Sequence, residues 1–136
     1  MSAGYSATPL SRKLGIGEGG TYALVDPPDG AAASLEPLPE GARRIAQPAA
    51  ADVVIAFATE RATLAAHVEE LAPAIFPDRT LWVAWPKRTS KVPTDITEDV
   101  VREVALPLGL VDVKVAAIDQ TWSGLKLDWR REHRAG

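Results

Sequence analysis

The strongest constraint on the fold is a run of β-branched and aromatic residues at 53–57 (VVIAF), because such a run is typical of a strand buried on both faces. Apolar residues then recur at helical spacing up to residue 75, where a proline-containing turn follows. Residues 80–85 (TLWVAW) form the next apolar run. A strand, a helix and a second strand in this order predict two parallel strands joined by a right-handed crossover.

The same pattern continues toward the C-terminus. Thr94 or Asp95 is expected to cap the next helix, since Asp95 and Glu98 have the spacing of a capping box. Pro107 and a following glycine end that helix, and residues 111–118 form a further strand. This second helix and strand extend the predicted parallel sheet.

A final strand is indicated by alternation, because Leu125, Leu127 and Trp129 are separated by charged residues. The short turn before it favours an antiparallel return, and the alternation suits a sheet margin with one wet face. We therefore predict an α/β fold: a three-layer Rossmann-like sandwich with a mostly parallel sheet of about five to six strands and a C-terminal antiparallel hairpin strand.

The N-terminal half gives weaker signals. A short helix near residue 10, a buried strand at 21–25 and a short helix within 31–38 are expected, whereas 43–46 is at best a weak strand. The five residues at 47–51 are too few for a crossover between adjacent parallel strands, so 43–46 is either marginal or not a regular parallel strand. We expect one domain spanning 1–136, with an N-terminal arm at 1–20 and a frayed tail at 130–136.

Composition excludes several chemistries. The chain has no cysteine and two histidines, which removes disulfides, thiolate nucleophiles and cysteine-based metal sites, so we expect no metal and no cofactor. A formal charge of −3 argues against nucleic acid as the main partner.

No apolar run approaches the roughly 20 residues of a membrane span, and the N-terminus lacks a signal sequence, so a cytoplasmic location without membrane contact is expected.

The layout of residues 52–131 resembles the second half of a class I methyltransferase domain, and residues 15–25 look like the approach to its first strand. The resemblance implies an S-adenosylmethionine site after that strand, where the family places a glycine-rich loop. Here residues 26–30 (DPPDG) stand instead, Gln47 follows the strand whose end should carry the acidic ribose ligand, and the family's third strand is missing. The resemblance thus implies the fold with a degenerate cofactor loop.

A second resemblance covers nearly the whole chain. Residues 4–10 (GYSATPL), 85–87 (WPK), 92–95 (VPTD), 111–115 (VDVKV) and 122–125 (WSGL) resemble phrases of an uncharacterised bacterial family, domain of unknown function 3052. This resemblance implies a family and a bacterial source but no activity.

Three segments end predicted strands and carry chemistry, and parallel strands would bring them to one edge of the sheet, where open α/β folds bind ligands. Their candidate ligand-binding residues are Asp26, Asp29, Gly30, Trp85, Lys87, Arg88, Lys91, Asp119, Trp122 and Ser123. The loop after residue 85 could hold an anion with its three cations beside a helix N-terminus. A solvated basic loop is the simpler alternative, and Asp95 weakens the anion hypothesis because its carboxylate would occupy the capping position.

The remaining candidates have equally simple alternatives. Asp26 and Asp29 could bind Mg²⁺ or share a proton, but turn chemistry also explains them. His67 is expected to be a boundary residue, since no acid or serine is locally positioned to make it a base. Trp85 and Trp122 fit either packing or a ligand wall.

The sequence therefore predicts a non-catalytic ligand-binding or regulatory module with an anionic small molecule as candidate partner; no residue is assigned a catalytic role. The alternative is a reduced S-adenosylmethionine-dependent transferase, or a nucleotide-handling enzyme that uses Asp26 or Asp29 as base. A homodimer through an edge hairpin at 122–131 is a further candidate.

Overall fold

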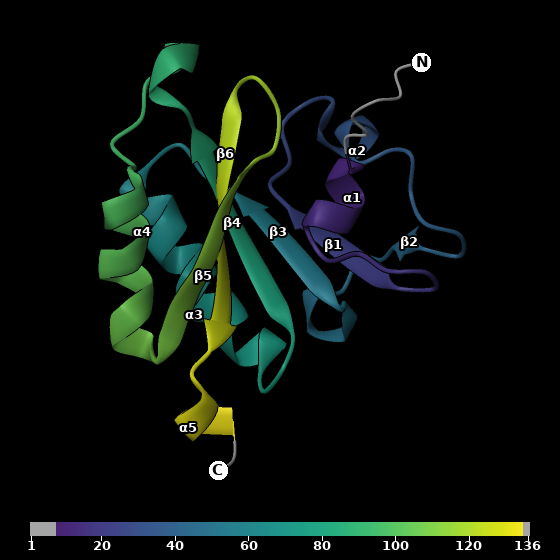
Figure 1. Ribbon diagram of the computed structural model, residues 1–136. Helices are drawn as coiled ribbons and strands as arrows, with labels where there is room; N and C mark the ends of the chain where they lie inside the picture. Colours follow the sequence, from purple (N-terminus) through teal and green to yellow (C-terminus); the bar gives the residue numbers. More distant parts are fainter. Residues whose placement is uncertain (1–7, 135–136) are drawn as a thin grey trace.

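A computed structural model describes residues 8–134, which are built on a six-stranded mixed sheet (Figure 1). The strands are β1 (Thr21–Val25), β2 (Arg43–Arg44), β3 (Val53–Phe57), β4 (Thr80–Pro86), β5 (Leu110–Ala117) and β6 (Trp122–Trp129). They lie in the order β2-β1-β3-β4-β6-β5, with β1 to β4 parallel and β6 antiparallel to both β4 and β5. The predicted α/β class and mostly parallel sheet are confirmed.

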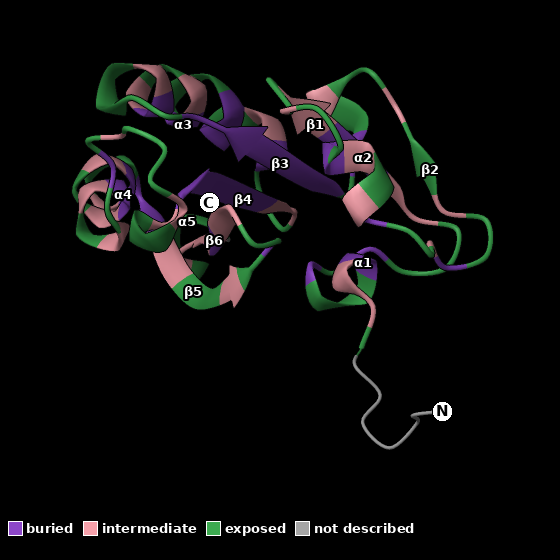
Figure 2. Cartoon of the chain, turned by 90° about the horizontal axis from the view of Figure 1, so that it is seen from above, coloured by how far each residue is buried: buried purple, intermediate pink, exposed green. Residues whose placement is uncertain are grey.

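Helical layers of unequal thickness cover the two faces of this sheet (Figure 2). The helices are α1 (Leu10–Lys13), α2 (Ala31–Ser34), α3 (Arg61–Ile75), α4 (Glu98–Ala105) and α5 (Arg131–Arg134), with single turns η1 (Pro48–Ala50), η2 (Arg88–Ser90) and η3 (Leu106–Leu108). α3 and α4 cover one face, and α1 and α2 cover the other. No helix among residues 8–134 has the length and apolarity that crossing a bilayer requires.

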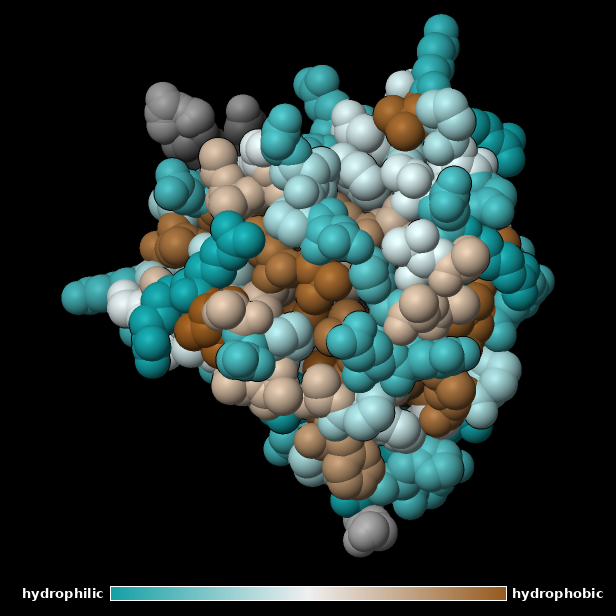
Figure 3. All heavy atoms as spheres, turned by 180° about the vertical axis from the view of Figure 1, so that it is seen from behind, coloured by the Kyte–Doolittle hydropathy of each residue, from teal (hydrophilic) through white to brown (hydrophobic). Residues whose placement is uncertain are grey.

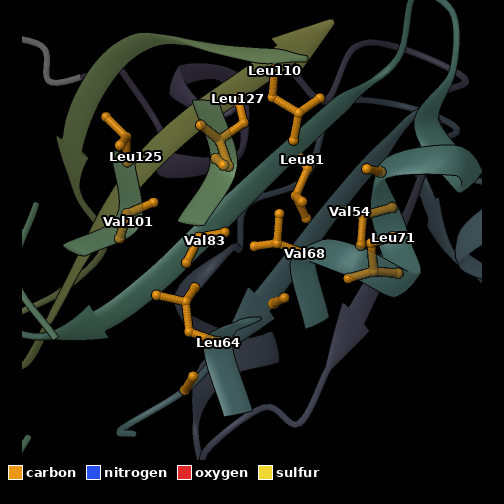
Figure 4. Packing of buried hydrophobic residues seen from close by; sticks show 14 of the residues in the cluster. Val54, Leu64, Val68, Leu71, Leu81, Val83, Val101, Leu110, Leu125 and Leu127 are labelled. Carbon is orange, nitrogen blue, oxygen red and sulfur yellow. The ribbon is translucent and has the colours of Figure 1, made fainter. Parts of the chain in front are cut away.

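The larger core lies under α3 and α4. Leu64 and Val68 of α3 are fully buried and lie beside Val83 of β4, in the same cluster as Val54 of β3 (Figure 4). Burial of each such side chain contributes about 1.5–3 kcal/mol to folding. All five residues of β3 are buried, which is why the sequence shows a continuous apolar run instead of alternation.

The second core is smaller and is organised around Trp82. This indole is fully buried, and its Nε1 donates a hydrogen bond to the carbonyl of Leu14 at 2.8 Å, which fixes the segment after α1 to the sheet. Phe57 meets Trp122 edge-to-face at 5.3 Å between ring centroids. The thin layer is therefore held to the sheet by apolar packing and by the hydrogen bond of Trp82.

β2 resolves the difficulty with residues 43–46. The strand is only two residues long, and it pairs with β1, where Thr21 lies opposite Arg43. β3 pairs with the other side of β1. The chain still has to return past β1 to the start of β3, and the few residues that contain η1 suffice because β2 is only two residues long. Residues 43–46 are therefore a marginal strand.

The predicted cap of α4 was wrong. α4 begins at Glu98, and its N-cap is Thr97, whose hydroxyl accepts a hydrogen bond from the backbone N–H of Val100. Asp95 instead accepts a hydrogen bond from the backbone N–H of Arg61 at 2.7 Å and so caps α3. Sequence spacing identified a capping residue but not the helix that it serves.

The predicted sheet margin was also wrong. β6 carries Leu125 and Leu127 but lies between β4 and β5, so both of its sides are already paired. β5 forms the margin, which leaves residues 122–129 without a free edge for a second copy. The alternation arises because one face of β6 is well covered and the other face is thinly covered, and not because β6 is an edge strand.

A short helix ends the described part of the chain. Residues 131–134 form α5, within the segment where we expect a frayed tail. His133 packs edge-to-face on Trp129, and the side chain of Arg134 donates to the carbonyl of Trp129. The first seven residues of the predicted N-terminal arm, and residues 135–136 of the tail, lie outside the described part.

Candidate functional site at the carboxyl edge of the sheet

The loops that follow β1, β4 and β5 lie at one edge of the sheet (top of Figure 1). β5 runs in the same direction as β4, because β6 is antiparallel to both. The backbone N–H of Lys87 donates to the carbonyl of Thr121 at 2.7 Å, which ties the loop after β4 to the turn after β5. The sequence-predicted convergence of the three loops is thus present in the fold.

A cleft of about 560 Å³ opens between the end of β4, η2 and the start of α4. We call it the basic cleft; it is lined by Trp85, Pro86, Lys87, Arg88, Lys91, Val92, Pro93, Thr94, Ile96, Thr97, Glu98 and Ser123. Trp85 and Ile96 are buried at its base, whereas Arg88 and Lys91 are exposed at its rim. The cleft therefore combines an apolar base with a charged rim.

The three cations of the cleft are held by a loop that is tightened by its own hydrogen bonds. The Ser90 hydroxyl donates to the carbonyl of Lys87 at 2.7 Å and accepts from the backbone N–H of Val92. Lys91 adopts a left-handed conformation at φ 63° that turns the chain toward α4. Within residues 8–134, Lys87, Arg88 and Lys91 form no ion pair with a carboxylate. Their charges remain available to a ligand.

The two acidic residues in the first turn of α4 pair with Arg102 and not with the cations of the basic cleft. Arg102 donates hydrogen bonds to Asp112 of β5 and to Asp99, and it also pairs with Glu98. The hydrogen bond with Asp112, followed by that with Glu98, raises the pKa of Arg102 above its ordinary value. The hydrogen bond from Arg102 likewise lowers the pKa of Asp112, although partial burial acts in the opposite direction. Glu98 thus reaches the cleft as a carboxylate that Arg102 already neutralises in part.

A second, smaller cavity of about 200 Å³ lies at the ends of β1 and β3. We call it the Asp26 pocket; it is lined by Asp26, Phe57, Ala58, Thr59, Thr63 and Trp122. Asp26 adopts a left-handed backbone conformation at φ 53°, which is uncommon for a residue other than glycine. Trp122 and Ser123 are neighbours in β6, yet Trp122 lines the Asp26 pocket and Ser123 lines the basic cleft.

His67 is a residue that the sequence interpretation undervalued. Its Nε2 lies 2.9 Å from the Asp26 carboxylate, although the two groups are not aligned for a hydrogen bond, so the buried nitrogen has no hydrogen-bond partner among the described residues. The acid next to this histidine comes from a segment that is distant in the sequence. The pair joins α3 to the loop after β1, and no local spacing signal could have found it.

Three predicted site residues have mainly structural surroundings. Asp119 accepts hydrogen bonds from the backbone N–H groups of Thr121 and Trp122, both at 2.8 Å, so its carboxylate shapes the turn. Gly30 is the N-cap of α2 at φ 85°. Asp29 is exposed and lines neither the basic cleft nor the Asp26 pocket. The structure thus separates Asp26 from Asp29 as candidates.

The loop after β1 does not have the form that the methyltransferase resemblance requires. Residues 26–30 contain two prolines and a single glycine, and α2 is only one turn long. A glycine-rich turn allows the backbone to approach a cofactor closely, and a long helix after it directs N–H groups at the ligand. Neither feature is present after β1, so this loop fits S-adenosylmethionine poorly.

Comparison with known proteins supports the fold. No protein-family model and no curated protein sequence matches the chain. Among solved structures, the chain is similar to a SAM-dependent methyltransferase from Aquifex aeolicus (TM-score 0.58, 13% identity, covering 85% of each chain). It is also similar to a methyltransferase from Pyrococcus furiosus (TM-score 0.55, 11% identity, covering 93% of this chain and 85% of that one).

A third similar structure is a possible exported protein from Bordetella parapertussis, with a TM-score of 0.58 and 10% identity, covering 87% of this chain and 65% of that one. Sequence identities this low support a shared fold but not a shared activity. Membership of the uncharacterised bacterial family stays a prediction, since no family model matches. What these likenesses show is that the chain has the Rossmann-like fold of SAM-dependent methyltransferases.

Proposed function

We propose that this protein is a non-catalytic ligand-binding or regulatory module, located in the cytoplasm, that holds an anionic small molecule in the basic cleft. The observation that carries the proposal is that Lys87, Arg88 and Lys91 line one cleft without a carboxylate partner among the described residues. Hydrogen bonds between ionised groups are roughly twice as strong as neutral ones, so such a cluster favours phosphate or carboxylate groups. The proposal requires no cofactor.

The cleft suits a small molecule better than a large protein surface. Its volume of about 560 Å³ lies within the usual range of about 300–1,000 Å³ for ligand sites. Hydrophobic residues on the rear face form separate groups among hydrophilic ones (Figure 3). The concave basic cleft, with its defined set of cations, therefore supports a small anionic ligand.

Titration with inorganic phosphate and pyrophosphate, followed by NMR of the backbone amides, tests the proposal. We expect shifts confined to residues 85–98 and 123, and their loss in the triple variant Lys87→Ala, Arg88→Ala, Lys91→Ala. A charge-matched control, Arg12→Ala, Lys13→Ala, Arg43→Ala, removes three exposed cations that lie outside the cleft. Equal weakening in both triple variants would mean that net charge alone attracts the anion, and the cleft would lose its role.

A reduced S-adenosylmethionine-dependent transferase, or a nucleotide-handling enzyme with Asp26 or Asp29 as base, is the second candidate. It is favoured by the names of the similar structures and by the contact of His67 with Asp26, since a histidine beside a carboxylate is a common acid–base arrangement. Thermal-shift and calorimetric measurements with S-adenosylmethionine, S-adenosylhomocysteine and nucleotides separate the two functions. Micromolar affinity for a methyl-donor compound would replace the first proposal with this one.

A further inference from the structure

Three cavities follow one another along the carboxyl edge of the sheet. The basic cleft shares Pro93 and Thr94 with a cavity of about 370 Å³, and that cavity shares Thr59 with the Asp26 pocket. The Thr94 hydroxyl donates to the carbonyl of Thr59 at 2.6 Å, so the shared walls are held together. An elongated molecule could therefore contact both ends of this edge at once.

The two ends of the edge carry opposite charge. Lys87, Arg88 and Lys91 lie at one end, whereas the middle cavity and the Asp26 pocket are lined by Glu60 and Asp26 and by no lysine or arginine. The imidazole of His67 lies 2.9 Å from the Asp26 carboxylate but lines neither cavity. Asp95 also lines the middle cavity, but its carboxylate is occupied as the cap of α3. A ligand that matches this distribution carries a negative group and a positive group at separate positions.

The Asp26 pocket has the chemistry of an ammonium site. The Asp26 side chain is 66% exposed, and Asp26 lines a cavity together with the edge-to-face pair of Phe57 and Trp122. Carboxylates attract cations by charge, and aromatic faces attract them by cation–π interaction. The hydroxyls of Thr59 and Thr63 can accept further hydrogen bonds from an ammonium group.

We propose that the ligand is a zwitterion whose anionic group lies in the basic cleft and whose ammonium group lies in the Asp26 pocket. This inference rests on the proposed function, because the anionic half is the ligand of the basic cleft. Binding at both ends makes the second contact intramolecular, so a matched zwitterion gains affinity over either half alone.

The test uses a series of ω-aminoalkyl phosphates of increasing chain length, with ethanolamine and inorganic phosphate as the separate halves, titrated against the full chain by calorimetry and NMR. We expect one chain length to bind at least about tenfold more tightly than inorganic phosphate. Its binding should shift the amides of residues 26 and 122 as well as those of 85–98. A series in which the amino group adds nothing at any length would overturn the inference.

Asp26→Asn is the decisive variant, because asparagine tolerates the left-handed conformation and removes only the charge. It should abolish the advantage of the aminoalkyl phosphate and leave inorganic phosphate binding unchanged. Asp29→Asn is the matched control, since Asp29 is on the same loop but lines none of the three cavities. Equal loss in both variants would exclude a specific role for Asp26.

Failure of the inference differs from failure of the proposed function. If inorganic phosphate binds and the aminoalkyl chain adds nothing, the basic cleft stands and the zwitterion is excluded. If inorganic phosphate does not bind the wild-type protein, the proposed function fails, and the inference fails with it.

Discussion

At the scale of single residues, Asp26 decides how the candidate site is assembled. Its left-handed conformation at φ 53° brings the carboxylate against His67 and into the wall of a cavity. Aspartate tolerates this region better than most residues but still costs about 1–2 kcal/mol relative to the right-handed conformation. Strained residues of this kind often lie at functional sites, which is consistent with a binding role for this loop.

The conformation of Asp26 gives a stability prediction. Asp26→Gly should be more stable than Asp26→Ala by about 0.5–1 kcal/mol, because glycine avoids the steric penalty of a left-handed Cβ but loses more entropy on folding. Asp29 does not have a positive φ, so Asp29→Ala should be more stable than Asp29→Gly. Urea unfolding of the four variants measures both differences. The same ranking at both positions would contradict strain at Asp26.

Asp26 was a sequence candidate, but its partner was not found from the sequence. The turn residues at 26–30 identified the end of a strand, and the topology then placed Asp26 at the carboxyl edge. His67 lies in the middle of α3, and its contact with Asp26 depends on how that helix packs on the sheet. A single sequence contains no signal for such a long-range pair, so it was interpreted as an isolated boundary histidine.

At the scale of secondary-structure elements, the ion pairs of Arg102 connect α4 to the margin of the sheet. Its guanidinium bonds Asp112 of β5 at 2.9 Å and two acids of its own helix. The acids in the first turn of α4 also suit the helix dipole. This connection holds α4 over the larger core and pairs Glu98 with Arg102, so Lys87, Arg88 and Lys91 are the lining charges of the basic cleft that have no ion-pair partner among the described residues.

The connection predicts a pH dependence. Because the folded-state pKa of Asp112 is lowered, its contribution to stability is present above its unfolded value of about 3.9 and is lost as the pH falls through the folded pKa. Asp112→Asn should therefore lower the free energy of unfolding at pH 7, and the difference from wild type should shrink below about pH 4. Thermal unfolding between pH 7 and pH 2 measures this.

Asp99→Asn serves as the control for that measurement. The Asp99 side chain is 86% exposed, and exposed ion pairs contribute only about 0–1 kcal/mol. It should change stability little at any pH. A pH-independent loss in Asp112→Asn would indicate lost packing instead of a lost charge interaction.

Elements with a strong periodic pattern were predictable, and short ones were not. The five buried residues of β3 and the inward stripe of α3 follow from composition and spacing, because each is long enough to need one consistent apolar face. The cap of α4 and the two residues of β2 depend instead on contacts with distant segments. Asp95 shows the reason: it has the spacing to cap one helix but lies nearer to the start of another.

At the scale of the whole molecule, the order of the strands could not be derived from the sequence. The directions of the strands were predictable, because a helix links each of these strands to the next. The directions determine which edge of the sheet is the carboxyl edge and therefore where the candidate site lies. The position of β6 between β4 and β5 depends on pairing that alternation alone does not encode. The three loops consequently lie at one edge of the sheet, although their candidate residues divide between two cavities, and the strand proposed for self-association is internal.

The free margin of the sheet gives the last prediction. β5 exposes about half of the Val113 and Val115 side chains, and an unpaired strand of this kind favours edge-to-edge association. Two features oppose it: Lys114 is exposed between the two valines, and the register shifts between Asp112 and Lys114 as in a β-bulge. We therefore expect a monomer in sedimentation velocity at about 100 µM, a concentration that detects dimers with a Kd of micromolar order. Lys114→Val should produce a dimer, whereas Lys13→Val, on the distant α1, should not. A wild-type dimer that Lys114→Val leaves unchanged would show that these two features do not control association.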